Sequence, residues 1–136
     1  MIFSLALFVV VFSLPVFFSE LRKSKAVLFS YFILIALHQV VAITNAFFFT
    51  TMGADKDASS FNQIGSELAS LGVFSFSIGS KFYENMLGVV YWVFGVSHFL
   101  GEQLSILAFS LFCAVLIKIL RQFGLLRYQV SILLVF

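Results

Sequence analysis

The sequence predicts an all-α fold: a polytopic transmembrane helical protein with about three spans, a truncated fourth and two helices on the outer membrane surface. Hydrophobic residues make up 62% of the 136 residues, charged residues only 10%, and the mean hydropathy is +1.12. Soluble domains carry roughly 25% charged residues, so this chain has too few to cover a surface in water. Its charges lie between long uncharged runs, which is the pattern of membrane helices and their loops.

The first uncharged run, residues 2–18, predicts the first span. At a rise of about 1.5 Å per residue, it is nearly as long as the hydrocarbon core of a bilayer is thick, roughly 30 Å. A cleaved signal peptide fits poorly, because no Lys or Arg precedes the run and no small-residue cleavage motif follows it. The charged segment 19–25 follows instead.

The second uncharged run, residues 26–50, is long enough to span the bilayer with some tilt. It contains His38 and Asn45, which share one face of the predicted helix. Polar side chains at membrane depth usually face protein or water. Hydrogen bonding between helices and a direct role in a site are both compatible with these two residues.

Residues 51–82 differ from the flanking runs because Gly, Ser, Asp and Lys accumulate there. Within this stretch the apolar residues recur at helical spacing: Phe61, Ile64, Leu68 and Leu71. This spacing predicts an amphipathic helix that lies on the membrane surface. Asp57, directly before Ala58, is a candidate N-cap for that helix.

Two further apolar segments, 85–100 and 103–117, are separated only by Gly101 and Glu102. If 103–117 alone crosses the membrane, six of the eight Lys and Arg residues fall on one side, namely Arg22, Lys23, Lys25, Lys118, Arg121 and Arg127. The positive-inside rule favours this topology and makes that side cytoplasmic. We therefore expect residues 51–102 outside, with 85–100 as the second surface helix, and 103–117 as the third span.

Aromatic residues and the last apolar run complete the predicted topology. Tyr83, Tyr91 and Trp92 suit the outer membrane–water interface, where aromatic belts gather. Residues 128–136 start another apolar run that is too short to span. We therefore expect residues 1–136 to form one membrane domain that is the amino-terminal part of a larger protein.

The candidate catalytic residues are Asp57 and Asp55, on the predicted outer loop. Two carboxylates two positions apart can bind a divalent metal or supply a general base. A solvated loop, with Asp57 only capping a helix, is the competing interpretation. Glu84 and Glu102 flank the segment 85–100 on the same side, although Glu102 also suits the dipole of a helix start. His98 lies near the same surface, as a hydrogen-bonding residue or a ligand.

Several classes of function are excluded by what the sequence lacks. It has no Walker-type loop, no G-x-G-x-x-G, no H-E-x-x-H and no G-x-S-x-G. Its one cysteine, Cys113, permits no internal disulfide. The scattered bases form no basic patch for nucleic acid. No cofactor is predicted beyond a possible divalent metal at the aspartate pair.

The order of motifs resembles a known family. An outer loop G-A-D-K-D-A-S-S-F-N (53–62) precedes an aromatic run ending F-G-V-S (94–97), a helix opening G-E-Q-L-S-I-L-A (101–108) and the closing K-I-L-R (118–121). This order is similar to the amino-terminal region of GT-C-type polytopic membrane glycosyltransferases and related surface-polysaccharide enzymes.

The resemblance implies a multi-pass protein of the bacterial inner (cytoplasmic) membrane that acts in cell-envelope polysaccharide biosynthesis. Its partners would be the lipid bilayer, a polyprenyl-phosphate-linked sugar donor and a glycan acceptor, with no nucleic acid. Members carry a catalytic acid on the first outer loop, and Asp57 with Ala58 and Phe61 matches their spacing. Asp55 is the second candidate, and Asn62 stands where members often carry histidine. The alternative is a non-catalytic integral membrane subunit or transporter component that uses residues 51–82 as a contact surface.

Overall fold

The computed structural model describes residues 2–48, 55–75, 78–125, 128, 130, 131 and 133, and only the backbone of residues 55–57. Within these ranges all regular structure is helical and no strand occurs, which confirms the predicted all-α class. The helices are α1 (Ile2–Phe17), α2 (Ser19–Arg22), α3 (Lys25–Phe47), α4 (Asp55–Leu71), α5 (Ser80–Phe94) and α6 (His98–Gln122).

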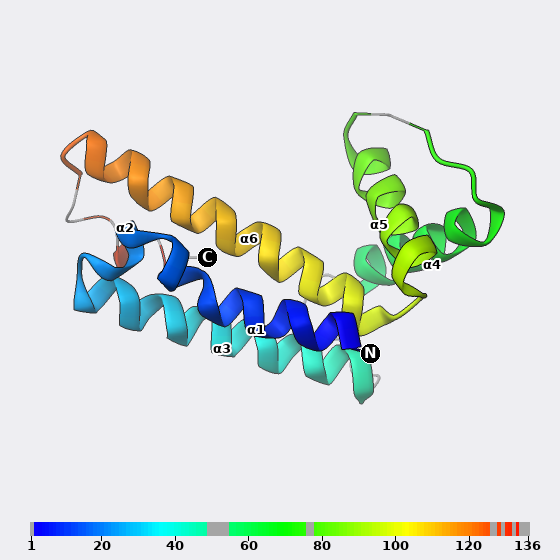
Figure 1. Ribbon diagram of the computed structural model, residues 1–136, viewed down its shortest axis with the longest axis horizontal. Coiled ribbons are helices and arrows are strands. Elements are labelled where there is room, and N and C mark those ends of the chain that lie inside the picture. Colours follow the sequence, from blue (N-terminus) through cyan, green and yellow to red (C-terminus); the bar gives the residue numbers. More distant parts are fainter. Residues whose placement is uncertain are drawn as a thin grey trace.

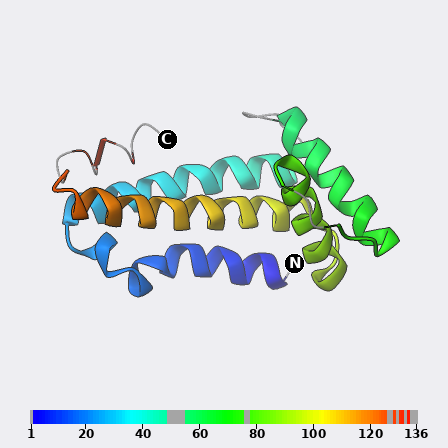
Figure 2. The ribbon, with the colours of Figure 1, turned by 90° about the horizontal axis from the view of Figure 1, so that it is seen from above.

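The helices form two regions. The long helices α1, α3 and α6 lie side by side and make the bundle, with α3 antiparallel to the other two (Figures 1 and 2). Helices α4 and α5 pack on each other across one end of the bundle and make the lobe. The amino terminus lies at the lobe end, whereas the short helix α2 lies at the opposite end (Figure 1).

Two helices are long and apolar enough to cross a membrane, α3 (Lys25–Phe47) and α6 (His98–Gln122). This is fewer than the three spans and truncated fourth that the sequence predicts. Helix α1 has 16 residues, about 24 Å at 1.5 Å per residue, which is shorter than a bilayer core of roughly 30 Å. Most of the expected fourth span, 128–136, lies outside the described residues.

The boundary between the second surface helix and the next span differs from the prediction. Helix α5 ends at Phe94, and Gly95 adopts a positive φ of 88°. The Ser97 hydroxyl then accepts a hydrogen bond from the backbone N of Leu100 and caps α6. The predicted break at Gly101 and Glu102 is therefore wrong, because both lie inside α6, which is longer than the expected 103–117.

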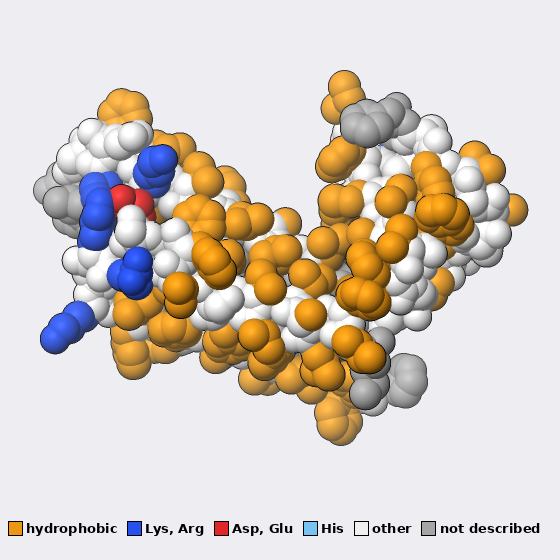
Figure 3. All heavy atoms as spheres, in the orientation of Figure 1, with side chains coloured by type: hydrophobic (Ala, Val, Ile, Leu, Met, Phe, Trp, Pro, Cys, Tyr) orange, Lys and Arg blue, Asp and Glu red, His pale blue; other side chains and the backbone are white. Residues whose placement is uncertain are grey.

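The bundle exposes large apolar side chains and buries hydrogen-bonded polar ones. Phe29, Leu37 and Phe112 are more than half exposed, and apolar side chains cover much of its visible length (Figure 3). Inside, the Gln39 and Gln103 amides donate to each other at 2.9 and 2.7 Å. An apolar exterior with paired polar groups inside is the pattern of helices packed in lipid.

Charged residues gather at the end of the bundle away from the lobe (Figure 3). There the Glu20 carboxylate lies 2.9 Å from the Arg121 guanidinium and 2.5 Å from the Lys23 ammonium. The pair with Arg121 joins α2 to the end of α6, whereas the pair with Lys23 is local to α2. The segments 19–25 and 118–122 thus lie together, as the charge pattern predicts, opposite the lobe.

The lobe depends on close packing between α4 and α5. A Cβ added at Gly65 would lie 2.9 Å from the Leu87 Cβ, and one added at Gly88 would lie 2.9 Å from the Leu68 Cβ. Such distances are too short for real side chains, so the two glycines allow the helix axes to approach. This packing fixes α4 and α5 as one rigid wall at the end of the bundle.

Candidate functional site

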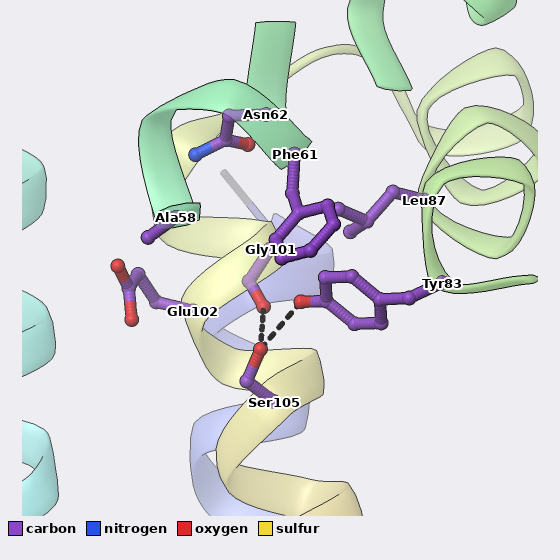
Figure 4. Close-up of a pocket in the computed structure, with 8 residues that line it drawn as sticks. All are labelled: Ala58, Phe61, Asn62, Tyr83, Leu87, Gly101, Glu102 and Ser105. Carbon is purple, nitrogen blue, oxygen red and sulfur yellow. Dashed lines mark hydrogen bonds between the residues drawn. The ribbon is translucent and has the colours of Figure 1, made fainter. Parts of the chain in front are cut away.

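A pocket of about 330 Å³ opens where the lobe meets the bundle. Three helices contribute its lining: Ala58, Phe61 and Asn62 from α4, Tyr83 and Leu87 from α5, and Gly101, Glu102 and Ser105 from α6 (Figure 4). It lies opposite the end that carries Glu20, Lys23 and Arg121 (Figure 3). The pocket therefore combines polar and aromatic groups at one end of the bundle.

Glu102 is the acidic side chain among the described residues that line the pocket. Its side chain is 17% exposed, and its Oε1 lies 3.4 Å from the Nε2 of His98, one helical turn earlier. The Asn45 amide, on α3, also hydrogen-bonds to the Glu102 carboxylate. Residues from two helices of the bundle thus hold this carboxylate in place.

A chain of hydroxyl groups forms another wall of the pocket. The Ser105 hydroxyl donates to the backbone carbonyl of Gly101 at 3.2 Å, one turn back along α6. Since that bond uses the serine proton, the Tyr83 hydroxyl is the donor in its 2.5 Å contact with the Ser105 oxygen (Figure 4). This chain links α5 to α6.

A second tyrosine ties α5 to α4 behind the pocket. The Tyr91 hydroxyl donates to the Asn62 side-chain carbonyl. A Cβ at Gly101 would lie 2.5 Å from the Tyr91 hydroxyl oxygen and 3.1 Å from the Asn62 carbonyl oxygen, so a larger residue there would displace the hydrogen bond between Tyr91 and Asn62. Burial raises the pKa of both Tyr83 and Tyr91 above the usual value of 10, which keeps both hydroxyls protonated near neutral pH.

The predicted catalytic residues Asp55 and Asp57 lie at the start of α4. Their side chains are outside the described part of the chain. Because α4 includes Asp55, Asp57 is inside the helix, and its predicted role as N-cap is wrong. Ala58, the next residue, lines the pocket. A carboxylate in the first turn is stabilised by the partial positive charge of the helix start.

The other predicted candidates divide between pocket and surroundings. Glu102 lines the pocket, and His98 contacts the Glu102 carboxylate. Glu84 is not among the lining residues. No group of three or more His, Cys, Asp or Glu side chains that could hold a metal occurs among the described residues. A divalent metal at Asp55 and Asp57 stays a prediction, since those side chains are not described.

Sequence reasoning missed most of the pocket. It assigned Tyr83 and Tyr91 to the membrane interface, which stays a prediction, and did not anticipate that Tyr91 is buried and that Tyr83 lines the pocket. Of the three aromatics, Trp92 is the exposed one. Ser105 gave no signal, because a serine inside an apolar helix is common. The polar residues Asn62 and Asn45 were noticed, but nothing in their spacing showed where they meet α5 and α6.

Comparison with known protein families, curated proteins and solved structures found no match to this chain. The family suggested by the sequence motifs therefore stays a prediction.

Proposed function

We propose that the chain belongs to a membrane glycosyltransferase of the GT-C type, in which the pocket at the lobe is part of the active site. The observation that supports this most is the position of the pocket. It lies at the opposite end of the bundle from the charged end that carries Lys23 and Arg121, and Ala58 on its wall directly follows Asp57. A carboxylate at the outer end of membrane helices is where chemistry on a lipid-linked sugar would occur.

The proposal includes a membrane position for the bundle. Helices α3 and α6 cross the bilayer, and α1 crosses beside α6, against which it packs. The four-residue helix α2 (Ser19–Arg22) continues the chain to the charged end. Arg22, Lys23 and Lys118 then face the cytoplasm, in accord with the positive-inside rule. The lobe and the pocket face the outside.

In the proposed reaction Asp57 is the general base. Its carboxylate accepts the proton of an acceptor hydroxyl as the oxygen attacks the anomeric carbon of the donor sugar. The bond from that carbon to the phosphate oxygen breaks, and polyprenyl phosphate leaves with the bonding electrons. The start of α4 favours the ionised form that a base needs. Asp55 helps to position the acceptor or a metal.

Substitution of the two aspartates tests the proposal. Asp57→Asn keeps the size of the side chain but removes the proton acceptor, so glycan transfer by the intact protein in its native membrane falls by about 100-fold or more. Asp55→Asn causes a smaller loss. Surface glycan released from cells is quantified, with the amount of protein in the membrane as the control. If both variants keep full activity, the non-catalytic membrane subunit becomes the better explanation.

Cysteine labelling tests the membrane position separately. In a Cys113→Ser background, single cysteines at Ser24 and Gln122 are protected from a membrane-impermeant reagent in intact cells, and one at Ser60 reacts. Ser60 is exposed on α4, and Gln122 is exposed at the end of α6. If the cysteine at position 24 or 122 reacts with the impermeant reagent in intact cells, the proposed orientation is reversed.

A further inference from the structure

We infer that the pocket between α4, α5 and α6 binds the acceptor as a single uncharged, hydroxyl-rich sugar ring, and that the phosphate of the donor binds elsewhere. This inference rests on the proposed function, because it assigns one of the two substrates to the described pocket. It depends on which hydrogen-bonding groups the pocket offers, on its charge and on its shape.

The polar groups that line the pocket are mainly hydrogen-bond acceptors. Ser105 uses its proton on the Gly101 carbonyl and Tyr83 uses its proton on Ser105, so both oxygens keep lone pairs for a ligand. The Glu102 carboxylate has about four lone-pair positions, more than its contacts with Asn45 and His98 need. A ligand that fits must bring several donors, as a sugar ring does.

Asn62 supplies the complementary donor. Its carbonyl oxygen accepts the proton of Tyr91, which fixes the orientation of the amide. The amide nitrogen therefore points away from Tyr91, toward the side of the pocket where Ala58 and Glu102 lie (Figure 4). A hydroxyl group between Asn62 and Glu102 would accept from the amide and donate to the carboxylate.

The charge of the pocket disfavours a phosphate. Phosphate groups are bound by Arg, Lys or free backbone N–H groups, and no Lys or Arg is among the described residues that line this pocket. The Glu102 carboxylate, which lines the pocket, repels a phosphate and tolerates a neutral ring.

The apolar part of the pocket suits the carbon face of a sugar ring. The rings of Phe61 and Tyr83 meet at right angles, with centroids 5.3 Å apart, and Leu87 adjoins them. Figure 4 shows Phe61 between Tyr83 on one side and Glu102 on the other. A volume of about 330 Å³ is at the lower end of ligand pockets, roughly 300–1,000 Å³. It accommodates one ring rather than a chain.

Saturation-transfer NMR on the intact purified protein in detergent tests the inference without requiring catalysis. The probes are methyl pyranosides of glucose, galactose, mannose and N-acetylglucosamine, with inorganic phosphate as competitor. At least one glycoside shows transfer to its ring C–H protons, and phosphate does not displace it. Glu102→Gln and Phe61→Leu each weaken binding on the order of tenfold, because they remove a charged acceptor and the aromatic wall.

Matched controls are Glu84→Gln and Phe82→Leu, which change the same residue types outside the pocket lining and leave binding unchanged. Absence of binding by all four glycosides, displacement by phosphate, or equal binding by the Glu102 and Phe61 variants would each overturn the inference. The two proposals can be refuted separately. Glycan transfer without glycoside binding would refute only the assignment of the acceptor to this pocket, whereas glycoside binding by a protein with no transfer activity would refute only the proposed glycosyltransferase function.

Discussion

The bundle and the lobe treat their polar residues differently. In the bundle, Gln39 and Gln103 hydrogen-bond to each other in both directions and are almost inaccessible. Where the lobe joins the bundle, Glu102, Tyr83 and Ser105 are also hydrogen-bonded, but they keep free lone pairs on a pocket wall. Paired polar groups specify how helices meet, whereas groups with spare bonding capacity can receive a ligand.

The two regions also differ in the way their helices approach. In the bundle the contacts between helices include a long-range bond from the Tyr31 hydroxyl on α3 to the Val11 carbonyl on α1, at 2.7 Å. In the lobe the contacts depend on two glycines, Gly65 and Gly88. A larger side chain on the exposed apolar face of the bundle would meet no neighbouring helix. A larger side chain at Gly65 or Gly88 would clash with the facing helix of the lobe.

The largest expected effect is that of Gly88→Leu in the lobe. Its side chain would displace Leu68 and Phe74, which lie within 3.3 Å of the position of a new Cβ, and overpacking typically costs about 1–3 kcal/mol. We expect α4 and α5 to separate, with loss of glycoside binding and of glycan transfer. Limited proteolysis of the purified protein detects the loosened lobe.

Ala108→Leu is the matched control for this change. Ala108 lies on the exposed face of α6, where an added apolar side chain meets lipid or detergent. We expect the Ala108→Leu variant to show the same rate of limited proteolysis and the same glycan transfer as the unsubstituted protein. If Gly88→Leu and Ala108→Leu had the same effect on proteolysis, the close packing at the glycines would not make the lobe more sensitive to substitution than the bundle.

A smaller effect is expected from Gln39→Leu in the bundle. It leaves the Gln103 amide buried without its partner, and hydrogen bonds between membrane helices contribute about 0.6 to 1.7 kcal/mol. The double variant Gln39→Leu with Gln103→Leu removes both amides and recovers most of the loss. The stability of the single and the double variant is measured by thermal unfolding in detergent. A double variant that is less stable than the single one would contradict a purely pairwise role for the amides.

The helices were the part of the structure that could be predicted from the sequence. The uncharged run 26–50 corresponds to α3 (Lys25–Phe47), because apolar composition and length define a helix that lipid can surround. The arrangement of Lys and Arg correctly grouped 19–25 with 118–122, since charge position constrains which helix ends share a side. The first span, predicted at 2–18, is not among the two helices long enough to cross a membrane, because α1 has only 16 residues.

The pocket was harder to predict because it depends on contacts across the chain. Gly101 beside Glu102 suggested a break, yet a glycine inside a helix can also make room for neighbours, here Tyr91 and Asn62. These two residues bond to each other although 29 positions separate them. The Ser97 cap was also missed, because Ser97 lies inside the apolar segment 85–100, which was predicted to be one surface helix. The place where α4, α5 and α6 meet could not be predicted, because no local sequence pattern encodes contacts between distant helices.

The smallest expected effect concerns Glu20 at the charged end of the bundle. Its hydrogen bond to Lys23, with the further charge of Arg121, holds the pKa of this carboxyl below the usual 4.5. A depressed pKa in the folded state means that the ion pairs stabilise the protein fully above pH 4.5 and less as the pH falls through the folded-state pKa. Glu20→Gln removes this contribution at pH 7.

We therefore expect the melting temperature of the Glu20→Gln variant in detergent to lie slightly below that of the unsubstituted protein at pH 7. The gap should narrow as the pH falls below 4.5, because the unsubstituted carboxyl then becomes neutral as well. It should also narrow at high salt, which screens partly exposed pairs. Glycoside binding stays unchanged, since the pocket lies at the other end. A gap that stays the same on acidification and at high salt would show that Glu20 acts through its packing rather than its charge, and the charged end would then resemble the bundle interior.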